Sequence, residues 1–220
     1  RLDCGFGGRD GFLGAVLVTF LTAGAVHGDA ESGLLQPLLV RPVSRAQYLL
    51  GRYLAASATG IAYVVVVYLG AVAIVGVAGG WWPSEPLGVA LRLAVAIAAI
   101  AALAVLGSVW LGATANGIFV LMLYGAGLVA GLMGAIGEGV GSARLERIAD
   151  VSSWALPFQG LYRDGLQRLV GDVGGPAGAL IQLGPLGSSQ DGGPLLLPWA
   201  VVHVALVLAA AVWLLRRRDL

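Results

Sequence analysis

The residues of this 220-residue chain that could carry out chemistry are few and widely separated. Ser108 and His203 could pair as a nucleophile and its general base, which would give a hydrolytic enzyme if the two side chains met. His27 and His203 lie near opposite ends of the sequence, and Cys4 is the only cysteine. The sequence therefore predicts neither a metal site nor a disulfide framework.

The sequence also lacks a usable signature for nucleotide binding. All 13 basic residues are arginine, whereas a P-loop needs a lysine on the nucleotide phosphates, so no standard ATPase site is expected. Gly125, Gly127 and Ala130 imitate a dinucleotide fingerprint, but they lie inside an apolar run rather than between a strand and a helix. The net charge of +1 gives no field that would favour nucleic acid. We expect no cofactor in this chain.

Composition places the chain in a membrane. Hydrophobic residues make up 58% of it and charged residues 11%, whereas soluble domains average about 25% charged. About 20 apolar residues in a helix cross a hydrocarbon core roughly 30 Å thick. The apolar runs predict an all-α, polytopic transmembrane helix bundle that forms one domain over residues 1–220. The five predicted spans are 11–28, 45–77, 89–111, 117–137 and 198–215.

The arginines predict how the spans are oriented. Two groups of arginines, one around the start of the second span and one after the last span, are separated by four crossings and therefore lie on one side: Arg41, Arg45 and Arg52, and Arg216, Arg217 and Arg218. The positive-inside rule makes that side cytoplasmic, so the C-terminus is predicted in the cytoplasm. Residues 138–197 are then extracytoplasmic, and two amphipathic helices are expected between positions 142 and 170. Arg92, near the outer start of the third span, is expected to extend towards the membrane interface.

A polar strip, residues 29–45, interrupts the first two apolar runs. Leucines at positions 34, 35, 38 and 39 give a short helix one apolar face. Pro42 ends that helix, and Ser44 with Gln47 forms a capping box for the next one. That next helix is long enough for its first turns to project into the cytoplasm. The strip could be an ordinary interfacial loop, or it could transmit force from another protein.

The same strip resembles the first cytoplasmic loop of ABC-2-type transporter permeases, in the branch that includes the nitrous-oxide-reductase maturation permeases. In that family an acidic residue, Ser-Gly, a leucine pair and a Pro-x-Ser-Arg ending form the coupling helix that docks on the ATPase. The residues that match are Glu31, Ser32, Gly33, Leu34, Leu35, Leu38, Leu39, Arg41, Pro42, Ser44 and Arg45.

The resemblance implies the membrane subunit of an ATP-binding-cassette exporter in the bacterial inner membrane. A cytoplasmic ATPase subunit would bind ATP and magnesium, and a second permease copy or a related subunit would complete the transporter. The family pattern has six spans, so a further span is expected before Arg1. The resemblance also implies that the extracytoplasmic helices cap the translocation path, although they could equally be plain interfacial helices. Membrane lipids surround the bundle.

Two other functions remain open. An ATP-independent channel, secondary transporter or assembly scaffold would need no ATPase, although the scarcity of charge within the spans speaks against ion coupling. An intramembrane enzyme would need Ser108 and His203 to meet, and the predicted topology places them towards opposite membrane faces. His203 could instead lie on a translocation path or be hydrogen-bonded within the bundle.

Overall fold

The computed structural model describes residues 44–170 and 192–217, and the regular elements in these residues are all α-helices. The helices are α3 (Arg45–Gly79), α4 (Pro86–Ser108), α5 (Ala113–Val140), α6 (Ala143–Ala155), α7 (Pro157–Val170) and α9 (Leu196–Arg217). Four of them, α3, α4, α5 and α9, are long and apolar enough to cross a membrane. This supports a multi-pass membrane protein. The predicted span at 11–28 lies outside the described residues.

Helix α3 begins where the sequence predicts, and its capping box is confirmed. Ser44 Oγ accepts a hydrogen bond from the Gln47 backbone N–H at 3.2 Å, and Gln47 Oε1 accepts one from the Ser44 N–H at 3.0 Å. These two bonds satisfy backbone groups that a helix start leaves without partners. The helix ends 35 residues later at Gly80, whose φ of 66° is the left-handed conformation that glycine adopts without strain.

Helix α4 is the centre of the bundle and contacts α3, α5, α7 and α9. Its buried side is rich in alanine, and small side chains allow helix backbones to approach closely in a membrane. The fully buried alanines are Ala99, Ala101, Ala102 and Ala104. Pro86 occupies the first turn, where its missing N–H has no cost. The helix therefore begins and ends three residues earlier than the predicted span 89–111.

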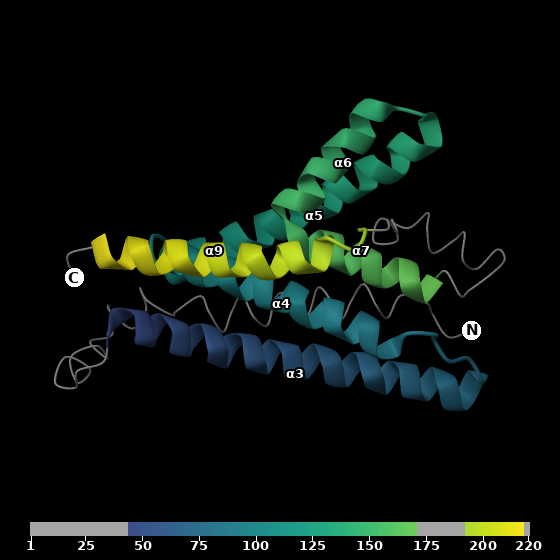
Figure 1. Cartoon of the computed structure of the whole chain (residues 1–220), viewed down its shortest axis with the longest axis horizontal. Helices are drawn as coiled ribbons and strands as arrows, with labels where there is room; N and C mark the ends of the chain where they lie inside the picture. The colour runs from purple at the N-terminus through teal and green to yellow at the C-terminus, as the bar shows by residue number, and fades with distance from the viewer. Residues whose placement is uncertain (1–43, 171–191, 218–220) are drawn as a thin grey trace.

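The turn from α4 into α5 is fixed by one buried amide. Asn116 Nδ2 donates to the Ala104 carbonyl at 2.9 Å, and Asn116 is fully buried. Helix α5 then runs from Ala113, four residues before the predicted start of its span. Figure 1 shows that the start of α3 and the end of α9 lie at the same end of the bundle, as four crossings require.

Helices α5 and α6 form an arm that leans away from the layer of α3, α4 and α9 (Figure 1). The chain reverses at Gly141, which has a φ of 66°. Helix α6 then packs antiparallel on the last turns of α5. A Cβ added at Gly137 would lie 2.9 Å from Leu145 Cβ and 3.0 Å from the Glu146 nitrogen, so glycine is what permits this contact.

Helix α7 returns from the arm into the bundle. Pro157 begins it, and helical backbone is disfavoured for the residue before a proline, so Leu156 (φ −121°, ψ 73°) separates α6 from α7. The two amphipathic helices expected between 142 and 170 are present. Two residues of the polar side of α7, Arg163 and Asp164, are buried against neighbouring helices.

Candidate functional site

The predicted coupling strip lies mostly outside the described residues. Glu31, Ser32, Gly33, Leu34, Leu35, Leu38, Leu39, Arg41 and Pro42 belong to that part of the chain. Ser44 is described as the N-cap of α3, and Arg45 is the first residue of that helix. The end of the strip is therefore attached to a rod of 35 residues, roughly 50 Å long at 1.5 Å per residue.

A cluster of charged side chains joins α4 to α7 at the other end of the bundle. Arg92 Nε donates to Asp164 Oδ2, and Arg92 Nη1 also donates to the Gly88 carbonyl at 2.9 Å. The Arg92 side chain is 14% exposed and the Asp164 side chain 5%. Each charge is thus removed from solvent together with its partner, which is the condition for tolerating buried ions.

The cluster extends from this pair to the first residue before α4. Arg168, one turn after Asp164 on α7, has its Nε 3.6 Å from Asp164 Oδ2. Its Nη1 donates to Glu85 Oε2 at 3.0 Å. Glu85 is the N-cap residue of α4 and more than half exposed. We call Glu85, Arg92, Asp164 and Arg168 the α4–α7 ion cluster.

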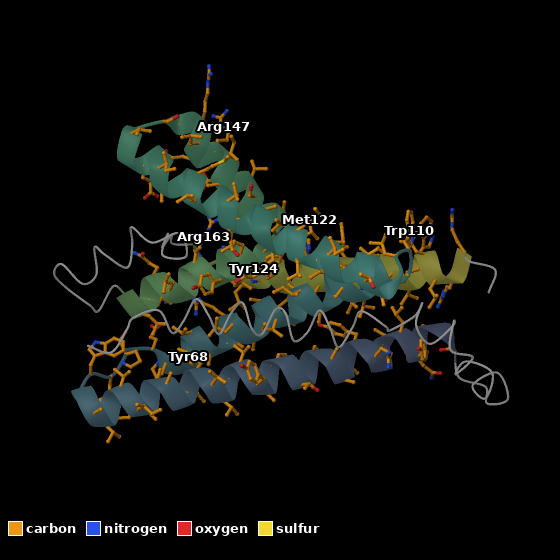
Figure 2. All side chains as sticks on the ribbon, turned by 180° about the vertical axis from the view of Figure 1, so that it is seen from behind. Tyr68, Trp110, Met122, Tyr124, Arg147 and Arg163 are labelled. Carbon is orange, nitrogen blue, oxygen red and sulfur yellow. The ribbon has the colours of Figure 1, made fainter. Side chains whose placement is uncertain are left out.

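Arg163 ties the opposite side of α7 to α5. Its Nη2 donates to the Gly127 carbonyl at 3.0 Å, and the residue is 2% exposed. The guanidinium lies on Gly131, where an added Cβ would come within 2.7 Å of Cζ. Burial lowers the pKa of Arg163, and the charge of Asp150 on α6 opposes that shift. Figure 2 shows Arg163 at the point where the arm leaves the bundle. Helix α7 is therefore anchored to α4 and α5 by different arginines.

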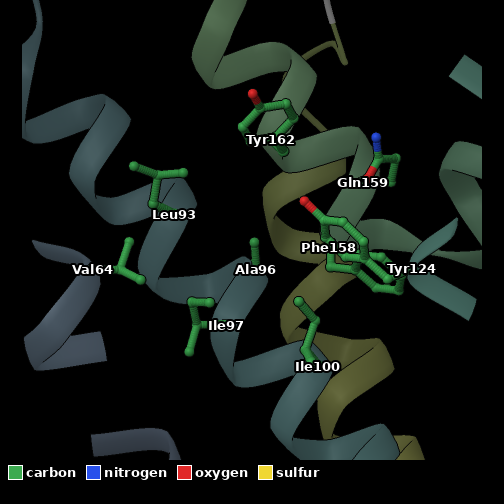
Figure 3. Close-up of a pocket in the computed structure, with 9 residues that line it drawn as sticks. All are labelled: Val64, Leu93, Ala96, Ile97, Ile100, Tyr124, Phe158, Gln159 and Tyr162. Carbon is green, nitrogen blue, oxygen red and sulfur yellow. The ribbon is translucent and has the colours of Figure 1, made fainter. Parts of the chain in front are cut away.

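A small cavity lies beside these anchors, between α3, α4, α5 and α7 (Figure 3). Its volume is about 20 Å³, enough for about one water molecule. The Tyr124 and Phe158 rings stack on its floor with centroids 6.2 Å apart. Its nine lining residues are Val64, Leu93, Ala96, Ile97, Ile100, Tyr124, Phe158, Gln159 and Tyr162. This cavity is too small for an organic substrate.

His203 and Ser108 have different surroundings. The His203 ring lies 6.2 Å from the Trp199 ring, and its buried Nε2 has no hydrogen-bond partner in the described part of the chain. Trp199 Nε1 donates to the Trp154 carbonyl at 2.8 Å. Ser108 is the last residue of α4, and its hydroxyl donates to the Val105 carbonyl at 2.8 Å. The described structure thus provides no nucleophile–base pair here, and His203 does not line the cavity of Figure 3.

The α4–α7 ion cluster is the feature that the sequence interpretation missed. The sequence interpretation expected Arg92 to extend towards the membrane interface and gave it no partner, whereas its guanidinium pairs with Asp164. A signal was present, since an arginine within an apolar run and an aspartate in the next amphipathic segment are both costly without partners. Comparison with protein-family models, with curated proteins and with solved structures gave no match to this chain.

Proposed function

We propose that this chain is the membrane-spanning permease subunit of an ABC-2-type transporter, which exports a substrate with energy from a separate ATPase. The residues between Glu31 and Arg45 would receive the motion of that ATPase. The observation that carries the proposal is the complete capping box at Ser44, which gives α3 a defined start directly after the strip in the sequence. A flexible connection at this point would dissipate the motion, whereas a capped helix transmits it along its axis.

Motion of α3 would reach the far end of the bundle through its packing on α4. Leu49 is fully buried and Val64 1% exposed, and both belong to the core that α3 shares with α4. The ion cluster then links α4 to α7 through Arg92 and Asp164. A displacement of α4 would therefore move α7 and change access at that end. This path gives the proposed switch between two access states a physical route.

The test is association with a defined ATPase. Each P-loop ATPase encoded beside this gene is co-expressed with the chain, and the complex is isolated and its ATP hydrolysis measured in lipid nanodiscs. We expect one ATPase to bind, and Leu34→Ser/Leu35→Ser with Arg45→Glu to abolish binding. Arg217→Glu is the matched charge reversal, on α9 at the same end of the bundle, and should leave binding intact.

The alternative of an ATP-independent channel, secondary transporter or scaffold makes the opposite prediction. If the chain transports or assembles normally while no encoded ATPase binds it, the coupling role of the strip is wrong. If an ATPase binds equally well to the triple variant, the docking surface lies elsewhere and the assignment of residues 31–45 fails.

A further inference from the structure

Helix α6 has two faces of opposite surroundings. One face packs on α5, with Ala149 fully buried and Leu145 against Gly137. The other face carries Arg144, Arg147 and Ile148, all exposed. Val151 continues this face one turn further, at 63% exposure. Positions 144, 147, 148 and 151 follow the spacing of a single helix face, which we call the outer face of α6.

An open groove of about 520 Å³ lies along this outer face. The described residues that line it all belong to α6: Ala143, Arg144, Arg147, Ile148, Val151 and Ser152. Polar and apolar groups are segregated along it. The two arginines are at the start of the helix, the aliphatic side chains follow, and Trp154, at 44% exposure, is one turn beyond Val151.

The two arginines form no ion pair within the described part of the chain. Glu146 lies against Gly137 of α5, and the charge of Asp150 acts on the buried Arg163. Figure 2 shows Arg147 extending away from the protein at the tip of the arm. Two guanidinium groups one turn apart therefore present uncompensated positive charge at the end of an apolar groove.

The surroundings of the arm identify the complementary molecule. Helix α5 is long and apolar enough to span a membrane, and its last turns lie at the tip of the arm that projects from the layer of α3, α4 and α9 (Figure 1). Helix α6 starts there and runs back along α5, so its outer face leads from a membrane surface into the apolar region. A molecule with an anionic head and an alkyl chain matches this order of groups.

We propose that the outer face of α6 binds an anionic phospholipid. Arg144 and Arg147 hold the phosphate, and an acyl chain lies along Ile148, Val151 and Trp154. A free phosphate would use the arginines but not the exposed aliphatic groups, and a neutral lipid would not use the arginines. The site depends on membrane embedding but not on an ATPase, so it stands or falls separately from the proposed transport role.

The test uses the full chain, purified in detergent without ATP or any partner. Phosphatidylglycerol and phosphatidylcholine with identical acyl chains are titrated, and bound lipid is counted by native mass spectrometry. We expect a preference for phosphatidylglycerol that falls about tenfold in Arg144→Gln/Arg147→Gln. Arg216→Gln/Arg217→Gln removes equal charge from α9 and should keep that preference. Equal loss in both variants, or an unchanged preference in the α6 variant, overturns the proposal.

Two further measurements separate the occupants. Ile148→Ser/Val151→Ser should lower affinity for long-chain phosphatidylglycerol while leaving competition by inorganic phosphate unchanged. A photo-crosslinking amino acid at Val151, in vesicles of both lipids, should give an adduct with the mass of phosphatidylglycerol. An adduct with a second copy of the chain in place of lipid would mean that this face is a protein interface, and the proposal would be wrong.

Discussion

Arg92 on α4 and Asp164 on α7 form a buried ion pair across 72 residues of sequence. The pair lies between a helix that centres the bundle and a helix that returns from a projecting arm. It therefore joins two helices that are separated along the chain by α5 and α6. It holds α7 on α4 together with the buried Phe158 and Leu161 of α7, which belong to the same core as α4.

Asp164→Asn should destabilise the protein by about 3–5 kcal/mol, because removing one partner leaves the other charge buried. The double variant Arg92→Met/Asp164→Leu should recover most of that loss, since an apolar pair leaves no buried charge. Arg168→Gln is the control and should cost less than about 1 kcal/mol, because its partner Glu85 is 57% exposed. Unfolding in detergent provides the free energies. Equal effects of Asp164→Asn and Arg168→Gln would contradict the argument.

Gly131→Ala should displace Arg163 and break its hydrogen bond to the Gly127 carbonyl, at a cost of about 1–3 kcal/mol. Gly125→Ala on the same helix is the matched control, because an added Cβ there meets nothing within 4 Å. It should be neutral or stabilising, since alanine favours a helix over glycine. Thermal unfolding distinguishes the two, and similar melting temperatures would contradict the close packing of Arg163.

Ser44→Ala should fray the start of α3 and cost about 1 kcal/mol, because the Gln47 N–H loses its acceptor. Hydrogen exchange of the amides in the first turn should accelerate. Thr59→Ala is the control, because the hydroxyl that it removes from the same helix donates to the Ala55 carbonyl and does not cap the helix start. In this variant the amides of the first turn of α3 should still exchange slowly. Slow exchange in both variants would show that the capping box does not secure the helix start.

The orientation can be measured with single cysteines in a Cys4→Ser background. Arg45→Cys should react with a membrane-impermeant maleimide only after the cells are permeabilised. Trp82→Cys lies in the exposed connection between α3 and α4 and should react in intact cells. The reverse pattern would place the start of α3 outside the cell, where a cytoplasmic ATPase has no access to it.

Hydropathy and capping signals predicted the helices that the structure describes. Ser44 and Gln47 predicted the first residue of α3 correctly, because a capping box is a local sequence pattern. The predicted span 89–111 ends three residues after α4 does, because Trp110 and Leu111 are apolar but lie in the turn. It also begins three residues after Pro86, the first residue of α4. An apolar run shows that a segment avoids water without showing where its backbone bends.

Local sequence patterns could not predict the contacts that α7 makes with other helices. Its sequence predicted an amphipathic helix, but not that Arg163 meets a backbone carbonyl of α5 and Asp164 an arginine of α4. Partners 36 and 72 residues away satisfy these charges. Only the assembled fold brings them together, because residues 142–170 alone do not show which distant groups their charges meet.

Leu156 alone separates α6 from α7, and its backbone is already hydrogen-bonded on both sides, to Ser152 and to Gln159. A connection of one hydrogen-bonded residue leaves little freedom between the two helices, so we expect α6 and α7 to move together. Tension in the surrounding lipid that tilts the arm would then pull on Asp164. In such a membrane, bilayer thickness and lateral pressure would act on the far end of the bundle in addition to any force transmitted through α3.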